Sequence, residues 1–205
     1  MKEKDIYTEL SSIRNLMERS SKFISLSGLA GILAGVYALL GAGLGYILIN
    51  NTFGFEPDDA NMNRPLIFWQ LFIIALTVLV FSVVTACGLT IQNAKNKSES
   101  VWNPVSRRML TASGVPLLTG GVFILIMLTK GEYDFIGSAC LIFYGLALFA
   151  GSHYTFVDIK WLGLCQILLG LLALILPVYS LYFWALGFGV LHIVYGSMMH
   201  FKYER

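Results

Sequence analysis

The stretch that decides the fold is residues 160–203, KWLGLCQILLGLLALILPVYSLYFWALGFGVLHIVYGSMMHFKY. It contains two long apolar runs, and between them lies the turn signal Pro177-Val178-Tyr179-Ser180. A helix of about 20 apolar residues is long enough to cross the ~30 Å hydrocarbon core of a bilayer. We therefore interpret this stretch as two membrane-spanning helices that fold back on each other.

The whole chain shares this apolar character. Of its 205 residues, 57% are hydrophobic and 13% are charged, and its mean hydropathy is +0.72. Soluble domains carry about 25% charged residues, so we predict an integral membrane protein. The net charge of +2 provides no basic surface for nucleic acid. The polar lead carries both signs of charge and precedes an apolar run that is too long for a signal peptide.

The pattern of apolar runs predicts an all-α fold with six membrane spans. These spans form three helix hairpins, over residues 23–92, 109–156 and 159–201, within a bundle that covers 23–203. Residues 1–22 form a separate lead. Its apolar side chains recur at helical spacing, which predicts an amphipathic helix at the membrane surface. This helix is interpreted either as solvated and without a partner, or as a docking surface for a protein partner.

The positive charges predict the orientation of the chain in the membrane. Only Arg64 and Lys130 fall in the connections on one side of the predicted spans. Cytoplasmic segments of membrane proteins are enriched in Lys and Arg, so we expect both termini to lie in the cytoplasm and the protein to reside in the cytoplasmic membrane. The positive residues on the cytoplasmic side would be Lys2, Lys4, Arg14, Arg19, Lys22, Lys95, Lys97, Arg107, Arg108, Lys160, Lys202 and Arg205.

A glycine spacing of seven residues recurs in the first, third and fifth predicted spans. A Tyr-Gly pair also recurs in the fourth and sixth predicted spans, since Tyr144-Gly145 and Tyr195-Gly196 occupy similar places. We interpret the chain as three duplicated hairpins in parallel orientation, related by an axis along the membrane normal. Small residues let helices approach closely in lipid, so the three odd-numbered spans are predicted to pack innermost or to form a dimer face. The predicted helix-packing residues are Gly28, Gly35, Gly114, Gly121, Gly163, Gly170 and Gly196.

The last hairpin resembles the repeat unit of HdeD-type proteins. Gly163, Gly170 and Pro177 lie at intervals of seven, and the aromatic-rich return ends in Gly196. HdeD-type proteins are small bacterial six-helix membrane proteins associated with acid resistance and built from such hairpins. The likeness is clearest over residues 160–200. It implies a non-enzymatic, stress-related membrane protein and transfers no catalytic residue.

A few polar side chains fall inside the predicted spans, where such groups are costly and mark candidate functional sites. Gln166 and His192 are equally far in sequence from Tyr179 at the turn, so we expect them at similar depth. Tyr195 follows His192 by three residues and shares its helix face. One interpretation is a hydrogen bond between helices, worth about 0.6 kcal/mol on average. The other is a ligand- or proton-binding site in which His192 would change its charge near neutral pH.

The sequence contains no arrangement of residues that predicts catalysis. We find no nucleophile–base set, paired carboxylates, zinc-ligand spacing or phosphate loop, so we predict no enzyme activity, no metal and no cofactor. A haem between His153 and His200 is disfavoured, because no spacing requires it. We predict a non-catalytic protein that is stress-related or acts as a membrane scaffold for a partner or a second copy. The alternative is a pathway for a small molecule or a proton around His192.

Overall fold

The computed structural model describes residues 27–53, 59–96 and 100–203, and this part of the chain contains helices and no strand. Six of its helical segments are long and apolar enough to cross a membrane. The predictions of an all-α fold and of six candidate spans are therefore confirmed. The predicted amphipathic lead, residues 1–22, lies outside the described residues.

The first five spans are built on single α-helices, and the sixth is composite. The five helices are α2 (Gly28–Phe53), α3 (Asp59–Asn96), α4 (Pro104–Lys130), α5 (Ile136–Gly151) and α6 (Asp158–Ile175). The sixth span runs through α7 (Ser180–Trp184), a π-helical stretch η4 (Ala185–Leu191) and α8 (His192–Tyr203). Short 3₁₀ turns are η1 (Tyr133–Phe135), η2 (Ser152–Tyr154) and η3 (Pro177–Tyr179).

Local sequence signals explain where α4 begins and ends. The Asn103 side chain accepts a hydrogen bond from the Ser106 backbone N–H at 2.8 Å, and the Ser106 hydroxyl accepts one from the Asn103 N–H at 3.0 Å. This reciprocal capping box satisfies donors that the first helical turn leaves unpaired. Pro104 follows at the first helical position, where its missing N–H costs nothing. Gly131 ends the helix with a φ of 76°, a left-handed conformation that favours glycine.

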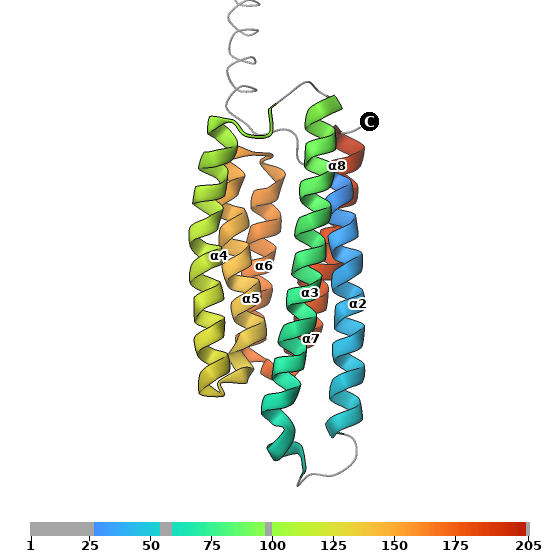
Figure 1. Ribbon diagram of the computed structural model, residues 1–205, viewed down its shortest axis with the longest axis vertical. Helices are drawn as coiled ribbons and strands as arrows, with labels where there is room; N and C mark the ends of the chain where they lie inside the picture. The colour runs from blue at the N-terminus through green and yellow to red at the C-terminus, as the bar shows by residue number, and fades with distance from the viewer. Residues whose placement is uncertain (1–26, 54–58, 97–99, 204–205) are drawn as a thin grey trace, which may run out of the picture.

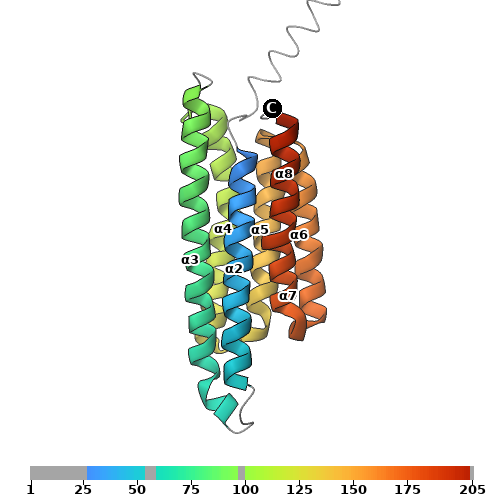
Figure 2. The ribbon, with the colours of Figure 1, turned by 90° about the vertical axis from the view of Figure 1, so that its right-hand side faces the viewer.

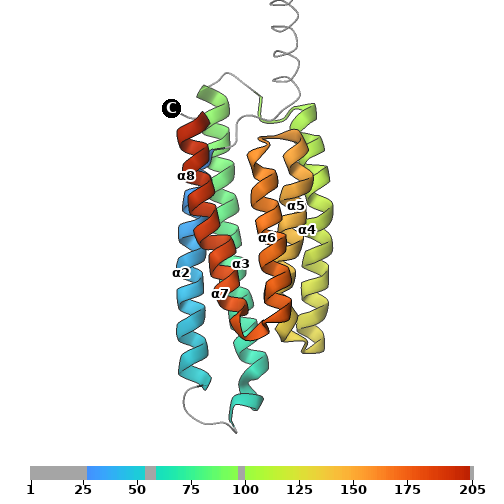
Figure 3. The ribbon, with the colours of Figure 1, turned by 180° about the vertical axis from the view of Figure 1, so that it is seen from behind.

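The six spans form two layers of three helices each (Figures 1, 2 and 3). In the first layer α2 lies between α3 and α8, and in the second layer α5 lies between α4 and α6. The segment α7–η4 packs against α2 and also contacts α5 and α6, so it joins the layers. We call the end of the bundle where α2 begins and α8 ends the terminal end, and the opposite end, which holds the Pro177 turn, the turn end.

The last two spans belong to different layers. From the Pro177 turn, α6 runs beside α5, whereas α8 runs beside α2 (Figure 3). The pairs α2 with α3 and α4 with α5 each pack side by side within one layer. The last pair therefore contributes one helix to each layer, and its polar residues lie where the two layers meet.

Glycines allow close helix contacts within each layer. A Cβ on Gly196 of α8 would lie 2.6 Å from both the Gly28 carbonyl oxygen and the Ile32 nitrogen of α2. A Cβ on Gly163 of α6 would lie 2.8 Å from the Gly145 carbonyl oxygen of α5. These neighbours are backbone atoms, so only residues without a side chain allow this approach.

The structure differs from the predicted packing at Gly114 and Gly121. A Cβ on either residue would meet no atom within 4 Å, whereas one on Gly120 would meet the Phe143 ring. Adjacent helical residues point about 100° apart, so the contact with α5 falls on Gly120 and the predicted pair faces outward. The third and fifth predicted spans, α4 and α6, both lie at the edges of their layer, and its central helix is α5. Few residues of α4 are buried. A seven-residue spacing identifies a face of small residues but not the neighbour that covers it.

Candidate functional site

Four groups from four helical segments meet at the boundary between the two layers. They are the side chains of Tyr144 (α5), Gln166 (α6) and His192 (α8), with the backbone carbonyl of Gly187 (η4). We call this set the polar cluster. Gln166 is fully buried, and His192 is 7% exposed.

The Gly187 carbonyl is the shared acceptor of the polar cluster. Gln166 Nε2 donates to it at 2.8 Å, and His192 Nδ1 donates to it at 2.9 Å. The proton on Nδ1 leaves Nε2 of a neutral imidazole as an acceptor, and the Tyr144 hydroxyl donates to it at 2.8 Å. Both ring nitrogens of His192 thus have partners within the protein.

The structure places Gln166 and His192 side by side, in agreement with their equal separation in sequence from Tyr179 at the turn. Gln166 Nε2 and His192 Nδ1 lie 3.5 Å apart. Both atoms direct a proton at the Gly187 carbonyl, so the two side chains are connected through that oxygen rather than by a strong direct hydrogen bond.

The π-helical stretch brings the Gly187 carbonyl to this position. Gly187 precedes His192 by five residues, and the histidine side chain folds back along its own helix to reach it. A Cβ on Gly187 would lie 2.5 Å from Gln166 Oε1, so glycine makes room for the glutamine. π-Helical turns are rare and concentrate at functional sites, and here the turn carries the acceptor that organises the polar cluster.

Three aromatic rings pack together at the polar cluster. The Phe188 ring stacks near His192 with a centroid distance of 6.0 Å and lies 5.0 Å from the Tyr144 ring. The centroids of Tyr144 and His192 are 5.4 Å apart. The Phe188 ring thus packs against two members of the polar cluster, and His192 is buried.

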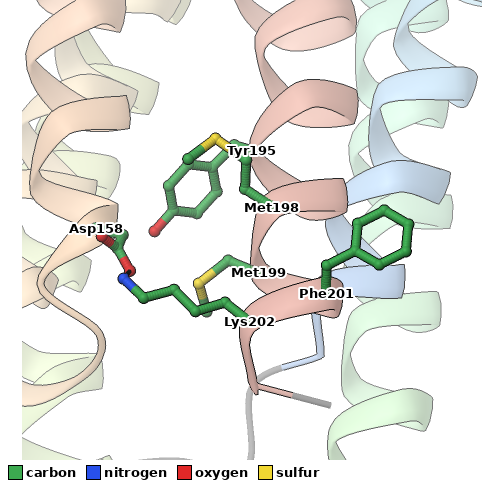
Figure 4. A pocket seen from close by; sticks show the side chains of 6 residues that line it. All are labelled: Asp158, Tyr195, Met198, Met199, Phe201 and Lys202. Atoms are coloured by element: carbon green, nitrogen blue, oxygen red, sulfur yellow. Dashed lines mark hydrogen bonds and ion pairs between the residues drawn. The ribbon is translucent and has the colours of Figure 1, made fainter. Parts of the chain in front are cut away.

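Tyr195 lies apart from Gln166 and His192. It lines a cavity of about 400 Å³ between the terminal ends of α6 and α8 (Figure 4). Neither Gln166 nor His192 lines this cavity. The three residues predicted as one site are thus divided between the buried polar cluster and the cavity. The full lining is Asp158, Tyr195, Met198, Met199, Phe201 and Lys202.

Tyr144 is the member of the polar cluster that sequence reasoning missed. The available signal was the internal repeat, in which Tyr144-Gly145 matches Tyr195-Gly196. Depth relative to the Pro177 turn relates only α6 and α8, so it does not reach a side chain on α5. Across the described part of the chain, no three His, Cys, Asp or Glu residues come close enough together to hold a metal ion.

No protein-family model, curated protein or solved structure matches this chain. The resemblance of residues 160–200 to HdeD-type proteins therefore stays a prediction, and the functional argument rests on the geometry of the bundle.

We expect Tyr144 and His192 to be energetically coupled across the two layers. Tyr144→Phe removes the hydroxyl that donates to Nε2, and His192→Leu removes the acceptor. The double variant should be less destabilised than the sum of the single variants, with a coupling of about 1 kcal/mol, since bonds of this kind average about 0.6 and reach about 1.7 kcal/mol. Unfolding free energies in mixed micelles measure this coupling.

Tyr37→Phe is the matched control for Tyr144→Phe. The Tyr37 hydroxyl lies 3.4 Å from the Thr85 hydroxyl and joins α2 to α3 within one layer. Its combination with His192→Leu should be additive. Additivity of Tyr144→Phe with His192→Leu would instead mean that the 2.8 Å contact carries no stabilisation.

Proposed function

We propose that this chain is a non-catalytic multi-pass membrane protein in which the polar cluster is a structural tie between two helix layers. The observation that carries the proposal is that both ring nitrogens of His192 are bonded to Tyr144 and Gly187. A general acid, a general base or a proton carrier has to offer a nitrogen to substrate or water. A histidine whose two ring nitrogens are both hydrogen-bonded within the protein is better suited to holding helices in position.

The biological role that we propose is stress tolerance, or a membrane scaffold for a protein partner. The likeness of residues 160–200 to HdeD-type proteins supports the first role. The lead, residues 1–22, with its helical spacing of apolar residues, supports the second through a docked partner or a second copy. The surrounding bilayer is the other partner.

The proposal includes a cytoplasmic location for both termini and a threefold hairpin repeat. The excess of Lys and Arg in the lead and in the sequence between the second and third predicted spans supports this orientation in a cytoplasmic membrane. Packing of α2 with α3 and of α4 with α5 supports two hairpins. The third hairpin differs from the other two, because α8 packs with α2 instead of with α6. We interpret this difference as divergence after the proposed duplication.

A pathway for a small molecule or a proton is the second candidate function. The cavity beside Tyr195 favours it, because Tyr195 and His192 are one turn apart on α8. Such a pathway would have to break the bond from Tyr144 to Nε2 before His192 could exchange a proton.

Proton flux into proteoliposomes separates the two candidates. With a trapped pH-sensitive dye and an imposed pH gradient, we expect the full chain to give no flux above that of empty vesicles. The result expected from a pathway is a flux in the wild type that His192→Leu abolishes and Tyr37→Phe leaves intact. That result would replace the structural role of His192 with a conducting one.

A further inference from the structure

The cavity beside Tyr195 lies at the ends of two apolar spans. Asp158 is the first residue of the fifth apolar span, and Lys202 is the last residue of the sixth. Figure 4 shows both residues at the cavity, with the Tyr195 ring and the two methionines beside them. Groups at the ends of membrane spans meet headgroups, and groups one or two turns further in meet acyl chains.

The wall of the cavity is suited to an acyl chain. Met198, Met199 and Phe201 give it an apolar surface, and methionine adapts to irregular apolar shapes. Met199 also packs with Phe156 and Ile159 in a buried apolar cluster that joins α8 to α6. The volume of about 400 Å³ falls in the usual range of small-molecule sites, about 300 to 1,000 Å³.

Among the described residues that line the cavity, one side chain is acidic and one is basic. Lys202 Nζ lies 2.8 Å from Asp158 Oδ2, and the two side chains are 56% and 29% exposed. An ion pair this exposed contributes little to stability, so a ligand with its own two charges can be inserted at small cost. A ligand with one charge would satisfy one partner and repel the other.

We propose that this cavity binds a phospholipid whose zwitterionic headgroup carries a primary amine, as in phosphatidylethanolamine. The ammonium group donates to the Asp158 carboxylate, and the phosphate accepts from the Lys202 ammonium. One acyl chain lies against Met198 and Phe201. A choline headgroup has no N–H for Asp158, and an anionic headgroup without an amine places a negative charge beside it.

Native mass spectrometry of the purified full chain, with three lipids of identical acyl chains, tests this proposal. We expect phosphatidylethanolamine to bind about fivefold more tightly than phosphatidylcholine or phosphatidylglycerol. Asp158→Asn should reduce the preference for ethanolamine over choline to about one. Lys202→Met should weaken the binding of all three lipids.

Lys160→Met is the matched control for Lys202→Met. Its ammonium lies at the same end of the bundle, 5.5 Å from the Phe149 ring, and it does not line the cavity. This control should leave lipid binding unchanged. Met198→Trp tests the apolar wall independently of charge, because Met198 is 59% exposed and its replacement fills the cavity without disturbing a buried core. It should reduce the binding of every lipid without lowering the unfolding temperature.

Two results would overturn the proposal. One is equal binding of the three lipids by the wild type, and the other is an ethanolamine preference that Asp158→Asn leaves intact. A competition experiment adds soluble phosphoethanolamine at the same concentration as the lipid. Displacement of the lipid by it would show that the headgroup alone is recognised and that the apolar wall plays no part.

Discussion

Replacing Gly196 with valine is expected to prevent stable packing of α8 against α2. A Cβ at this position would lie 2.6 Å from the Gly28 carbonyl oxygen and 2.6 Å from the Ile32 nitrogen. Backbone atoms cannot rotate away as a side chain can, so the two helices would have to separate. Overpacking costs about 1 to 3 kcal/mol where side chains can adjust, and we expect a loss of at least about 3 kcal/mol here.

The measurement is the unfolding free energy in mixed micelles, with the yield of monodisperse protein as a second readout. Gly121→Val is the matched control, because the same substitution there meets no atom within 4 Å. It should change stability by no more than about 0.5 kcal/mol. Equal losses in the two variants would mean that valine disturbs the helices themselves and that the α2–α8 contact is unimportant.

Gln166→Glu is expected to have the second large effect. The glutamate replaces the Nε2 donor with an oxygen that faces the Gly187 carbonyl, at a site where glutamine donates at 2.8 Å. The side chain is fully buried, so a carboxylate would have no solvent to stabilise it. Leaving a buried charge without its partner costs about 3 to 5 kcal/mol, and we expect the folded yield and the unfolding free energy to fall accordingly.

Gln166→Leu separates the charge from the loss of the hydrogen bond. It removes Nε2 and also Oε1, an oxygen to which no described residue donates a hydrogen bond. The Gly187 carbonyl keeps its bond from His192 Nδ1 at 2.9 Å, so the cost should be about 1 kcal/mol. If leucine destabilised the bundle as much as glutamate, the loss of the Nε2 donor, which both variants share, would account for the cost and the buried charge would not.

The spans were predictable because hydrophobic length is a local property of the sequence. The apolar stretch after Pro104 and the turn at Pro177 can both be identified in the sequence without knowing which helices are neighbours. Helix partners are not local. The seven-residue spacing identified Gly163 and Gly170 as packing residues, yet it also selected Gly114 and Gly121, where a Cβ would meet no atom within 4 Å.

The polar cluster was predictable only in part, for a related reason. Equal distance from a turn gives equal depth, which brought Gln166 and His192 together. It gives no rotation about the helix axis, so it does not show which side chains of neighbouring helices meet. Tyr195 lines the cavity, and the contact with His192 is made by Tyr144 from another helix.

The pairing of α2 with α8 has a consequence for biosynthesis. The first described helix packs against the last, so this interface joins the helices that are furthest apart in the described sequence and has the highest contact order in the bundle. While the ribosome is still translating the intervening spans, the face of α2 around Gly28 and Gly35 has no partner. We expect the second layer to assemble first and the first layer to close only after translation of α8, so premature termination before Gly196 would leave an inserted but incompletely assembled protein.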